Sequence, residues 1–242
     1  MRLRSLFNTI RRAAWLAGWM TVCSAAINPV AAHPELLSQI EQLDIEITAQ
    51  PGDAGLLVRR GELYRREGDF TAAAQDFKAA RELQPEFPDL DLYAGRLALE
   101  TGDAAGAEQL LGAYLGRQPG NASAWKLRGN ARLMLQQPLK AAQDYGQAIE
   151  NSKSPTPTLY MQQAKALQSA GPEHANEALQ VIDQGLARFP REISLLGLGM
   201  DISLERGALQ KARGYFSVVP QPVRQLPQWQ ARQATLENEG GS

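Results

Sequence analysis

The most constraining feature of the sequence is a pattern of small and aromatic residues that returns every 34 positions. Its first copy, in the stretch from Ala54 to Glu86, consists of Gly61, Tyr64, Ala73, Phe77, Ala80 and Pro85. Glycine and alanine at two of these positions leave almost no side chain, so two antiparallel helices can approach closely there while the aromatic rings fill the space beside them. A helix pair this small cannot bury its apolar face alone and has to stack on further copies.

Each copy also contains a signal that separates its two helices. In Gly68-Asp69 the glycine favours a helix end and the aspartate favours the start of the next helix. Gly102-Asp103 repeats this signal 34 residues later, and Gln136-Gln137-Pro138 replaces it in the third copy, where Pro138 can begin a helix. Each copy is therefore predicted to fold as helix, turn, helix.

The copies define five predicted units at residues 54–87, 88–121, 122–155, 156–192 and 193–219. The second and third units keep the register of the first through Gly95, Ala107, Pro119, Trp125, Gly129, Ala141, Tyr145 and Ala148. The fourth unit fits only with three extra residues in the loop around Gly171, and Gln163 stands at its small position. In the fifth unit Met200 occupies that position, with Gly199 beside it as an alternative, and Phe216 corresponds to Phe77.

This spacing resembles the tetratricopeptide repeat, whose 34-residue signature has the same succession of small, aromatic, Ala and Pro positions. The resemblance covers about residues 54–219. It implies an all-α fold: a right-handed α-solenoid of about five helix-turn-helix repeats with capping helices.

Both ends of the predicted solenoid are expected to be covered by further helices. Residues 33–53 contain a helix from Pro34 to Thr48 and a turn; Leu36, Ile40, Leu43 and Ile47 share one face of that helix. Residues 220–242 are predicted to form a helix from Leu226 to Glu237 and a disordered tail from Asn238.

Residues 1–32 have the features of a secretory signal peptide. Four arginines open the segment, an apolar run of about 15 residues follows, and Val30-Ala31-Ala32 supplies small residues at a cleavage site. That run is shorter than the roughly 20 residues a membrane-spanning helix needs. We expect export to the periplasm and no membrane insertion after cleavage; a cut after Ala26 and retention as an anchor are the alternatives.

The composition argues against several functional classes. The whole chain has 25 basic and 26 acidic residues, but four of the basic residues lie in the first 32 positions, so the remainder carries 21 against 26, a net charge of −5. Such a body does not favour nucleic-acid binding. The single cysteine, Cys23, lies in the signal segment, so neither a disulfide framework nor thiol chemistry is expected beyond it.

No motif for catalysis, metal binding or a cofactor emerges from the sequence. The two histidines, His33 and His174, have no partner at metal-ligand spacing. A cut after Ala32 would make His33 the amino terminus, where an amine and an imidazole can chelate a metal, but no other residue supports such a site. We therefore predict a protein that is not an enzyme and has no cofactor or metal.

The resemblance implies that the first helix of each repeat lines a concave, ligand-binding face. The residues that match the family's contact positions and form our candidate protein- or peptide-binding site are Arg59, Arg65, Arg66, Leu92, Tyr93, Arg96, Lys126, Asn130, Met134 and Tyr160. Cations dominate the amino-terminal half of this face, whereas Asp201 and Glu205 lie toward the other end. Apolar residues between them suit an extended peptide or an amphipathic helix, although Leu99, Leu133 and Leu167 could equally pack against neighbouring repeats.

These observations together predict a non-catalytic scaffold of the bacterial cell envelope that binds another envelope or secreted protein in its concave groove. The alternative is a periplasmic chaperone or envelope-assembly accessory that holds its clients transiently.

Overall fold

A computed structural model of the protein describes residues 33–240, and within that range every regular element is a helix. The predicted all-α repeat fold is confirmed. The predicted signal peptide at residues 1–32 and the last two residues of the predicted tail lie outside the described residues.

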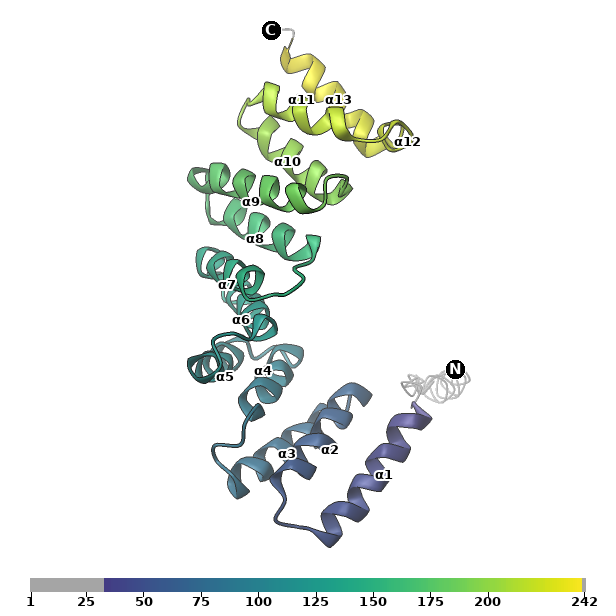
Figure 1. The fold of residues 1–242 in the computed structure, drawn as a ribbon, viewed down its shortest axis with the longest axis vertical. Coiled ribbons are helices and arrows are strands. Elements are labelled where there is room, and N and C mark those ends of the chain that lie inside the picture. Colours follow the sequence, from purple (N-terminus) through teal and green to yellow (C-terminus); the bar gives the residue numbers. More distant parts are fainter. Residues whose placement is uncertain (1–32, 241–242) are drawn as a thin grey trace, which may run out of the picture.

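The helices follow one another along an elongated stack that begins with α1 and ends with α13 (Figure 1). Their bounds are α1 (Pro34–Ala49), α2 (Ala54–Glu67), α3 (Phe70–Leu83), α4 (Leu90–Glu100), α5 (Ala104–Arg117), α6 (Ala122–Met134), α7 (Pro138–Glu150), α8 (Pro157–Ala170), η1 (Pro172–His174), α9 (Ala175–Arg188), α10 (Ile193–Glu205), α11 (Leu209–Val218), α12 (Gln221–Arg224) and α13 (Pro227–Gly240). Each of the five predicted units contains one antiparallel pair, from α2 and α3 to α10 and α11.

The turns inside the pairs form where the sequence predicts them. Gly68 takes up left-handed backbone with φ of 91°, and the carboxylate of Asp69 accepts a hydrogen bond of 2.9 Å from the backbone N–H of Ala72. Gly102 repeats the left-handed conformation with φ of 84°. In the third pair Gln136 adopts φ of 57°, a conformation that is uncommon for a residue with a side chain.

The small residues of the pattern lie where two helices touch. A Cβ atom built on Gly61 would lie 2.7 Å from Cε1 of Phe77, and one built on Gly95 would lie 2.8 Å from Cγ of Leu111. Gly129 faces the ring of Tyr145 in the same way, with 3.0 Å to its Cε1. In each of these three pairs a residue of the second helix therefore fills the space that the glycine of the first helix leaves.

The fifth pair departs from the predicted register by one residue. Gly199 and Tyr215, not Met200 and Phe216, form its close contact: a Cβ on Gly199 would lie 2.8 Å from the Tyr215 ring. Phe216 instead turns toward the carboxyl-terminal helix, where its ring centre lies 6.4 Å from that of Trp229. Because a terminal pair has a different neighbour on its outer side, the two adjacent aromatic residues divide these roles between them.

The fourth pair accommodates its three extra residues in η1, the short helical turn between α8 and α9. Gln163, which replaces the expected small residue, does not point at its partner helix. Its side-chain amide lies against Gly146 of the preceding helix, 2.9 Å from where a Cβ on that glycine would be. Glycine at this point of α7 gives room for the larger side chain.

Two buried ion pairs, which the sequence analysis did not identify, join the helices of the first and third pairs. Arg60 donates to both carboxylate oxygens of Asp76 at 2.6 and 2.8 Å, and Arg128 does the same to Asp144 at 2.8 and 3.0 Å. Hydrogen bonding to Asp76 raises the pKa of the Arg60 guanidinium above its ordinary value. Arg60 also reaches Asp44 of α1 at 2.6 Å, so it connects three helices.

Terminal helices cover both ends of the stack. Leu36, Ile40 and Leu43 of α1 are buried against α2, as the predicted apolar face requires. At the other end Trp229 and Leu236 of α13 are buried. Our expectation of a disordered tail from Asn238 was wrong for its first residues, because α13 continues to Gly240.

We expect Gly61→Ala to destabilise the fold by about 1–3 kcal/mol, because the added methyl group overlaps the Phe77 ring. Gly116→Ala is the matched control. Gly116 lies in α5 with nothing near its Cβ position, so the same change there should stabilise by about 0.5–1 kcal/mol through helix propensity. Urea denaturation followed by circular dichroism measures both, and equal effects would contradict the assigned contact.

Asp91 at the start of α4 links three helices through charged hydrogen bonds. Its oxygens accept from Arg81 of α3 at 2.7 Å and from Arg117 of α5 at 2.5 Å. Burial by itself raises the pKa of this carboxyl group, but the hydrogen bonds from the two arginines outweigh it and hold the pKa below its ordinary value. The carboxylate is thus stabilised more in the folded than in the unfolded chain.

Asp91→Asn should therefore lower the free energy of unfolding at pH 7 by about 1–3 kcal/mol, the usual contribution of charged hydrogen bonds. A lowered pKa means that this contribution is complete above the ordinary value of about 3.9 and is lost as the pH falls through the folded-state value. Denaturation from pH 7 to pH 3 should show a constant difference between the two proteins down to about pH 5 and a shrinking one below pH 4. A difference that persists unchanged at pH 3 would be inconsistent with this role.

Candidate functional site

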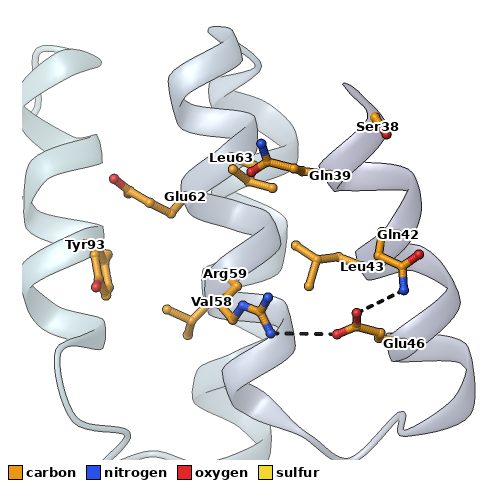
Figure 2. A pocket seen from close by; sticks show the side chains of 10 residues that line it. All are labelled: Ser38, Gln39, Gln42, Leu43, Glu46, Val58, Arg59, Glu62, Leu63 and Tyr93. Carbon is orange, nitrogen blue, oxygen red and sulfur yellow. Dashed lines mark hydrogen bonds and ion pairs between the residues drawn. The ribbon is translucent and has the colours of Figure 1, made fainter. Parts of the chain in front are cut away.

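A hollow of about 550 Å³ lies between α1, α2 and α4 at the amino-terminal end of the stack. Figure 2 shows it with α1 on one side, α2 in the middle and α4 opposite. Its lining residues are Ser38, Gln39, Gln42, Leu43 and Glu46 from α1, Val58, Arg59, Glu62 and Leu63 from α2, and Tyr93 from α4.

The apolar part of this hollow comes from side chains that the fold holds firmly. Leu43, Val58 and Leu63 are buried in the core on either side of α2. Tyr93 is half-buried, and its ring stacks on that of Phe77 with 6.4 Å between centres. Phe77 is the residue that packs on Gly61, so the close helix contact also fixes one wall of the hollow.

The rim of the hollow is polar and mostly exposed. Gln39 and Gln42 are exposed on α1, and Gln42 donates a hydrogen bond of 3.1 Å to Glu46. Arg59 extends toward Glu46 with 3.7 Å between Nη1 and Oε2, as Figure 2 shows. Since the Arg59 side chain is 66% exposed, this ion pair is weak and can open at little cost.

Four charged residues on α2 and α4 form a continuous ladder beside the hollow: Arg96, Glu62, Arg65 and Glu100. Arg65 donates two hydrogen bonds to Glu62 at 2.8 and 2.9 Å and a third to Glu100 at 2.6 Å. Arg96 donates to the same Glu62 at 3.2 Å. Hydrogen bonding to Glu62, and then to Glu100, raises the pKa of the Arg65 guanidinium above its ordinary value. Two of the predicted binding cations are therefore already paired within the chain.

The structure separates the ten predicted site residues into three groups. Arg59, Arg66, Lys126 and Met134 are exposed; Arg65, Tyr93, Arg96 and Asn130 are half-buried; Leu92 and Tyr160 are buried. Only Arg59 and Tyr93 line the hollow. Asn130 accepts a hydrogen bond of 2.7 Å from the hydroxyl of Tyr145, so its amide contributes to packing within the third pair.

The two buried members of the set belong to the core. Leu92 packs in the cluster that joins α4 to α5 and α6, together with Leu111 and Tyr114. The Tyr160 ring lies at the edge of Phe189, and its Cβ is 3.0 Å from the Cβ position of Gly185. Neither side chain is available to a ligand in this conformation. Among Leu99, Leu133 and Leu167, for which packing against neighbouring repeats was the alternative, Leu167 is also buried.

The acidic end of the predicted charge gradient is also engaged by other residues. Arg232 of α13 donates to both oxygens of Asp201 at 2.6 Å, and Glu205 accepts a hydrogen bond of 3.0 Å from Gln168. The carboxyl-terminal helix thus supplies an internal partner for a charge that the sequence places on a binding face.

The main contribution that the sequence analysis missed is that of α1, which supplies half of the lining. Gln39, Gln42 and Glu46 are spaced like the apolar residues Ile40, Leu43 and Ile47 and each directly precede one of them. A polar stripe beside the buried stripe of a terminal helix is a detectable signal, whereas the apolar spacing alone predicts only a cap.

The described part of the chain, residues 33–240, offers no cluster of three or more His, Cys, Asp or Glu side chains arranged to hold a metal ion. Within the same residues no helix is both long enough and apolar enough to cross a membrane.

The fold defines the class of the protein as an α-solenoid of stacked helix pairs. Residues 64–131 match the sequence model of the tetratricopeptide repeat. The recurring glycine contacts and helix pairs extend the same architecture on both sides of that match. Residues 64–131 therefore carry the tetratricopeptide-repeat sequence pattern, and the helix pairs on both sides of them share its fold. No curated protein matches its sequence significantly.

Several solved structures share this architecture. A tetratricopeptide repeat protein from Parabacteroides merdae is 18% identical with a TM-score of 0.59, covering 86% of this chain and 81% of its own. YrrB, described as a TPR protein with an unusual peptide-binding site, is 17% identical with a TM-score of 0.64 and covers 74% of this chain and 91% of its own. PilW, described as a widely conserved type IV pilus biogenesis factor, is 15% identical with a TM-score of 0.62, covering 82% of this chain and 90% of its own. At these identities the likeness establishes the fold.

Glu62→Gln should disrupt the ladder and lower the free energy of unfolding by about 1–3 kcal/mol. The Arg65 side chain is only 13% exposed, and of the two carboxylates in the ladder it would keep only that of Glu100. Glu82→Gln is the control: Glu82 is exposed and pairs at 3.9 Å with Lys78 on the same helix, so its loss should cost less than about 0.5 kcal/mol. Denaturation of the two variants side by side tests the difference. Similar, small effects would show that the ladder does not stabilise the pairing of α2 with α4.

Proposed function

We propose that this protein is a non-catalytic scaffold of the bacterial cell envelope that binds a segment of another envelope or secreted protein in the hollow between α1, α2 and α4. The observation that carries this proposal is the combination of a preformed apolar floor with an exposed polar rim. A tetratricopeptide-repeat fold supports a role as a protein–protein interaction scaffold.

The hollow fits a short peptide segment better than a flat protein surface. An apolar side chain of the ligand can contact Leu43, Val58 and Tyr93, while the amides of Gln39 and Gln42 can hydrogen-bond to its backbone. Arg59 needs only to leave its weak pair with Glu46 in order to meet an acidic group on the ligand. The ladder beside the hollow keeps α2 and α4 at a fixed spacing, so little ordering is required on binding.

Two of the similar structures point in the same direction. YrrB is described by its peptide-binding site and PilW by its part in pilus biogenesis, and both share this fold. Location in the periplasm is supported by the sequence of residues 1–32, with its arginines, apolar run and small residues before His33.

The second candidate is a chaperone or assembly accessory that holds unfolded clients transiently. Exposed apolar side chains outside the hollow favour it, among them Met134 at 49% and Leu139 at 41% exposure on α6 and α7. A scaffold should co-purify with one partner in a fixed ratio, whereas a chaperone should cross-link to many clients.

A photoactivatable amino acid at position 42 should cross-link one partner in cells, because Gln42 faces the hollow. The same amino acid at position 41 is the control, since Glu41 is exposed on α1 but does not line the hollow. Immunoblots and mass spectrometry of the cross-linked species read the result. Equal yields at positions 41 and 42 would place the contact surface elsewhere.

Reversing a charge at the rim of the hollow gives a second test of the site through the cross-linking yield from position 42. Arg59→Glu should reduce the yield from position 42 without changing the melting temperature, because Arg59 is exposed. Arg213→Glu, an exposed arginine on α11, should leave the yield unaltered. Reversal of Arg96 is unsuitable for this test because it would place a carboxylate beside Glu62.

A further inference from the structure

Glu67 at the end of α2 has a largely buried carboxylate that contacts His33, the residue immediately before α1. Its side chain is 13% exposed. Both of its oxygens face the backbone nitrogen of His33, Oε1 at 3.2 Å and Oε2 at 3.4 Å, and Nδ1 of the His33 ring is 3.4 Å from Oε2. The two residues are 34 positions apart and line one hollow together with Leu36 and Phe70.

A carboxylate this well shielded from water is costly unless a cation or several hydrogen bonds compensate it. Within an uncut chain, the His33 nitrogen is a neutral amide with one hydrogen, which two oxygens at 3.2 and 3.4 Å have to share. An α-ammonium at the same place would offer three hydrogens and a positive charge. The adjacent Arg65 does not supply that charge, because its described hydrogen bonds go to Glu62 and Glu100.

The sequence provides the means of creating such an ammonium group at this position. Val30, Ala31 and Ala32 give a signal-type endopeptidase the small residues it requires immediately before His33. A cut after Ala26, the alternative, would leave six residues in front of His33, so the His33 nitrogen would remain an amide.

We propose that the protein is processed between Ala32 and His33 and that Glu67 holds the α-ammonium group created on His33. The step is a hydrolysis: water adds across the peptide bond, Ala32 keeps the new carboxylate, and the amine of His33 takes up a proton. The endopeptidase belongs to the export machinery of the cell. The proposal rests on the export that forms part of the proposed function, and it is independent of what the groove binds.

Processing then completes the fold. The ion pair ties the first residue of the mature chain to the end of α2 and so fixes the start of α1, the helix that supplies half of the lining of the candidate binding hollow. Arg66, which lines the same second hollow and is exposed, remains in contact with solvent.

The site of the cut is tested on the full chain. We would express the protein with residues 1–242 in a bacterium, isolate the periplasmic fraction and determine the intact mass and the amino-terminal peptide. A chain that begins at His33 is the expected result. A chain that begins at Ile27, or that retains Met1, would overturn the proposal.

The contact between the α-ammonium group of His33 and Glu67 is tested on purified protein by measuring the effect of one substitution in two proteins that differ at the amino terminus. One protein begins at His33 after release from a cleavable fusion, and the other begins at Val30, so that its residue 33 carries an amide nitrogen. Glu67→Gln should lower the melting temperature of the first by about 2–4 °C more than that of the second, the shift typical of one partly buried ion pair in a chain of this size.

Glu35→Gln is the matched control for this comparison. Glu35 lines the same hollow and carries the same charge, but it is exposed and its carboxylate has no described contact with the His33 nitrogen. It should shift both proteins equally. An equal effect of Glu67→Gln on the two proteins would refute the ammonium contact, whereas a negative cross-linking result at position 42 would affect only the groove.

Discussion

The close contact between a glycine on one helix and a large side chain on its partner determines the geometry of the whole stack. Gly61, Gly95, Gly129 and Gly199 each lie so near the second helix that an added methyl group would overlap a ring or a leucine. This contact fixes the distance within the first, second, third and fifth pairs, and stacking of successive pairs then fixes how the first helices line up. The walls of the hollow depend on it directly, because Phe77 meets Gly61 on one side and Tyr93 on the other.

Charged side chains connect neighbouring helices once their distance is fixed. Buried Asp76 and Asp144 hold the helices of two pairs together, Asp91 connects three successive helices, and the ladder from Arg96 to Glu100 joins two repeats. A buried carboxylate without its arginine would be expensive, so each of these pairs favours one arrangement over its alternatives. The consequence for binding is that Arg65 and Arg96 are already paired within the chain, whereas Arg59 at the rim of the hollow can easily change partner.

Much of the fold could be predicted because it is encoded locally and repeatedly. A glycine followed by aspartate marks a turn through its own conformational preferences, and the two recurrences of Gly61 at a spacing of 34, Gly95 and Gly129, identify the contact. The site was less predictable because burial depends on which repeat lies next. Leu92 and Tyr160 occupy family contact positions, yet neighbouring helices cover them. The pairs Arg60 with Asp76 and Arg128 with Asp144 recur at twice the repeat length, a regularity that was present in the sequence and would have identified them.

The position of the hollow has a consequence for how the molecule responds to its partner. In a solenoid each repeat is stabilised mainly by its nearest neighbours, so the terminal helix is held on one side only and opens more readily than the interior. Among residues 33–240, α1 is both the first helix of the stack and one wall of the hollow. A bound segment that contacts α1 and α4 at once would hold α1 against the rest of the stack. Ligand binding and local unfolding of α1 would then compete, so the α1 amide hydrogens would exchange more slowly in the complex than in the free protein.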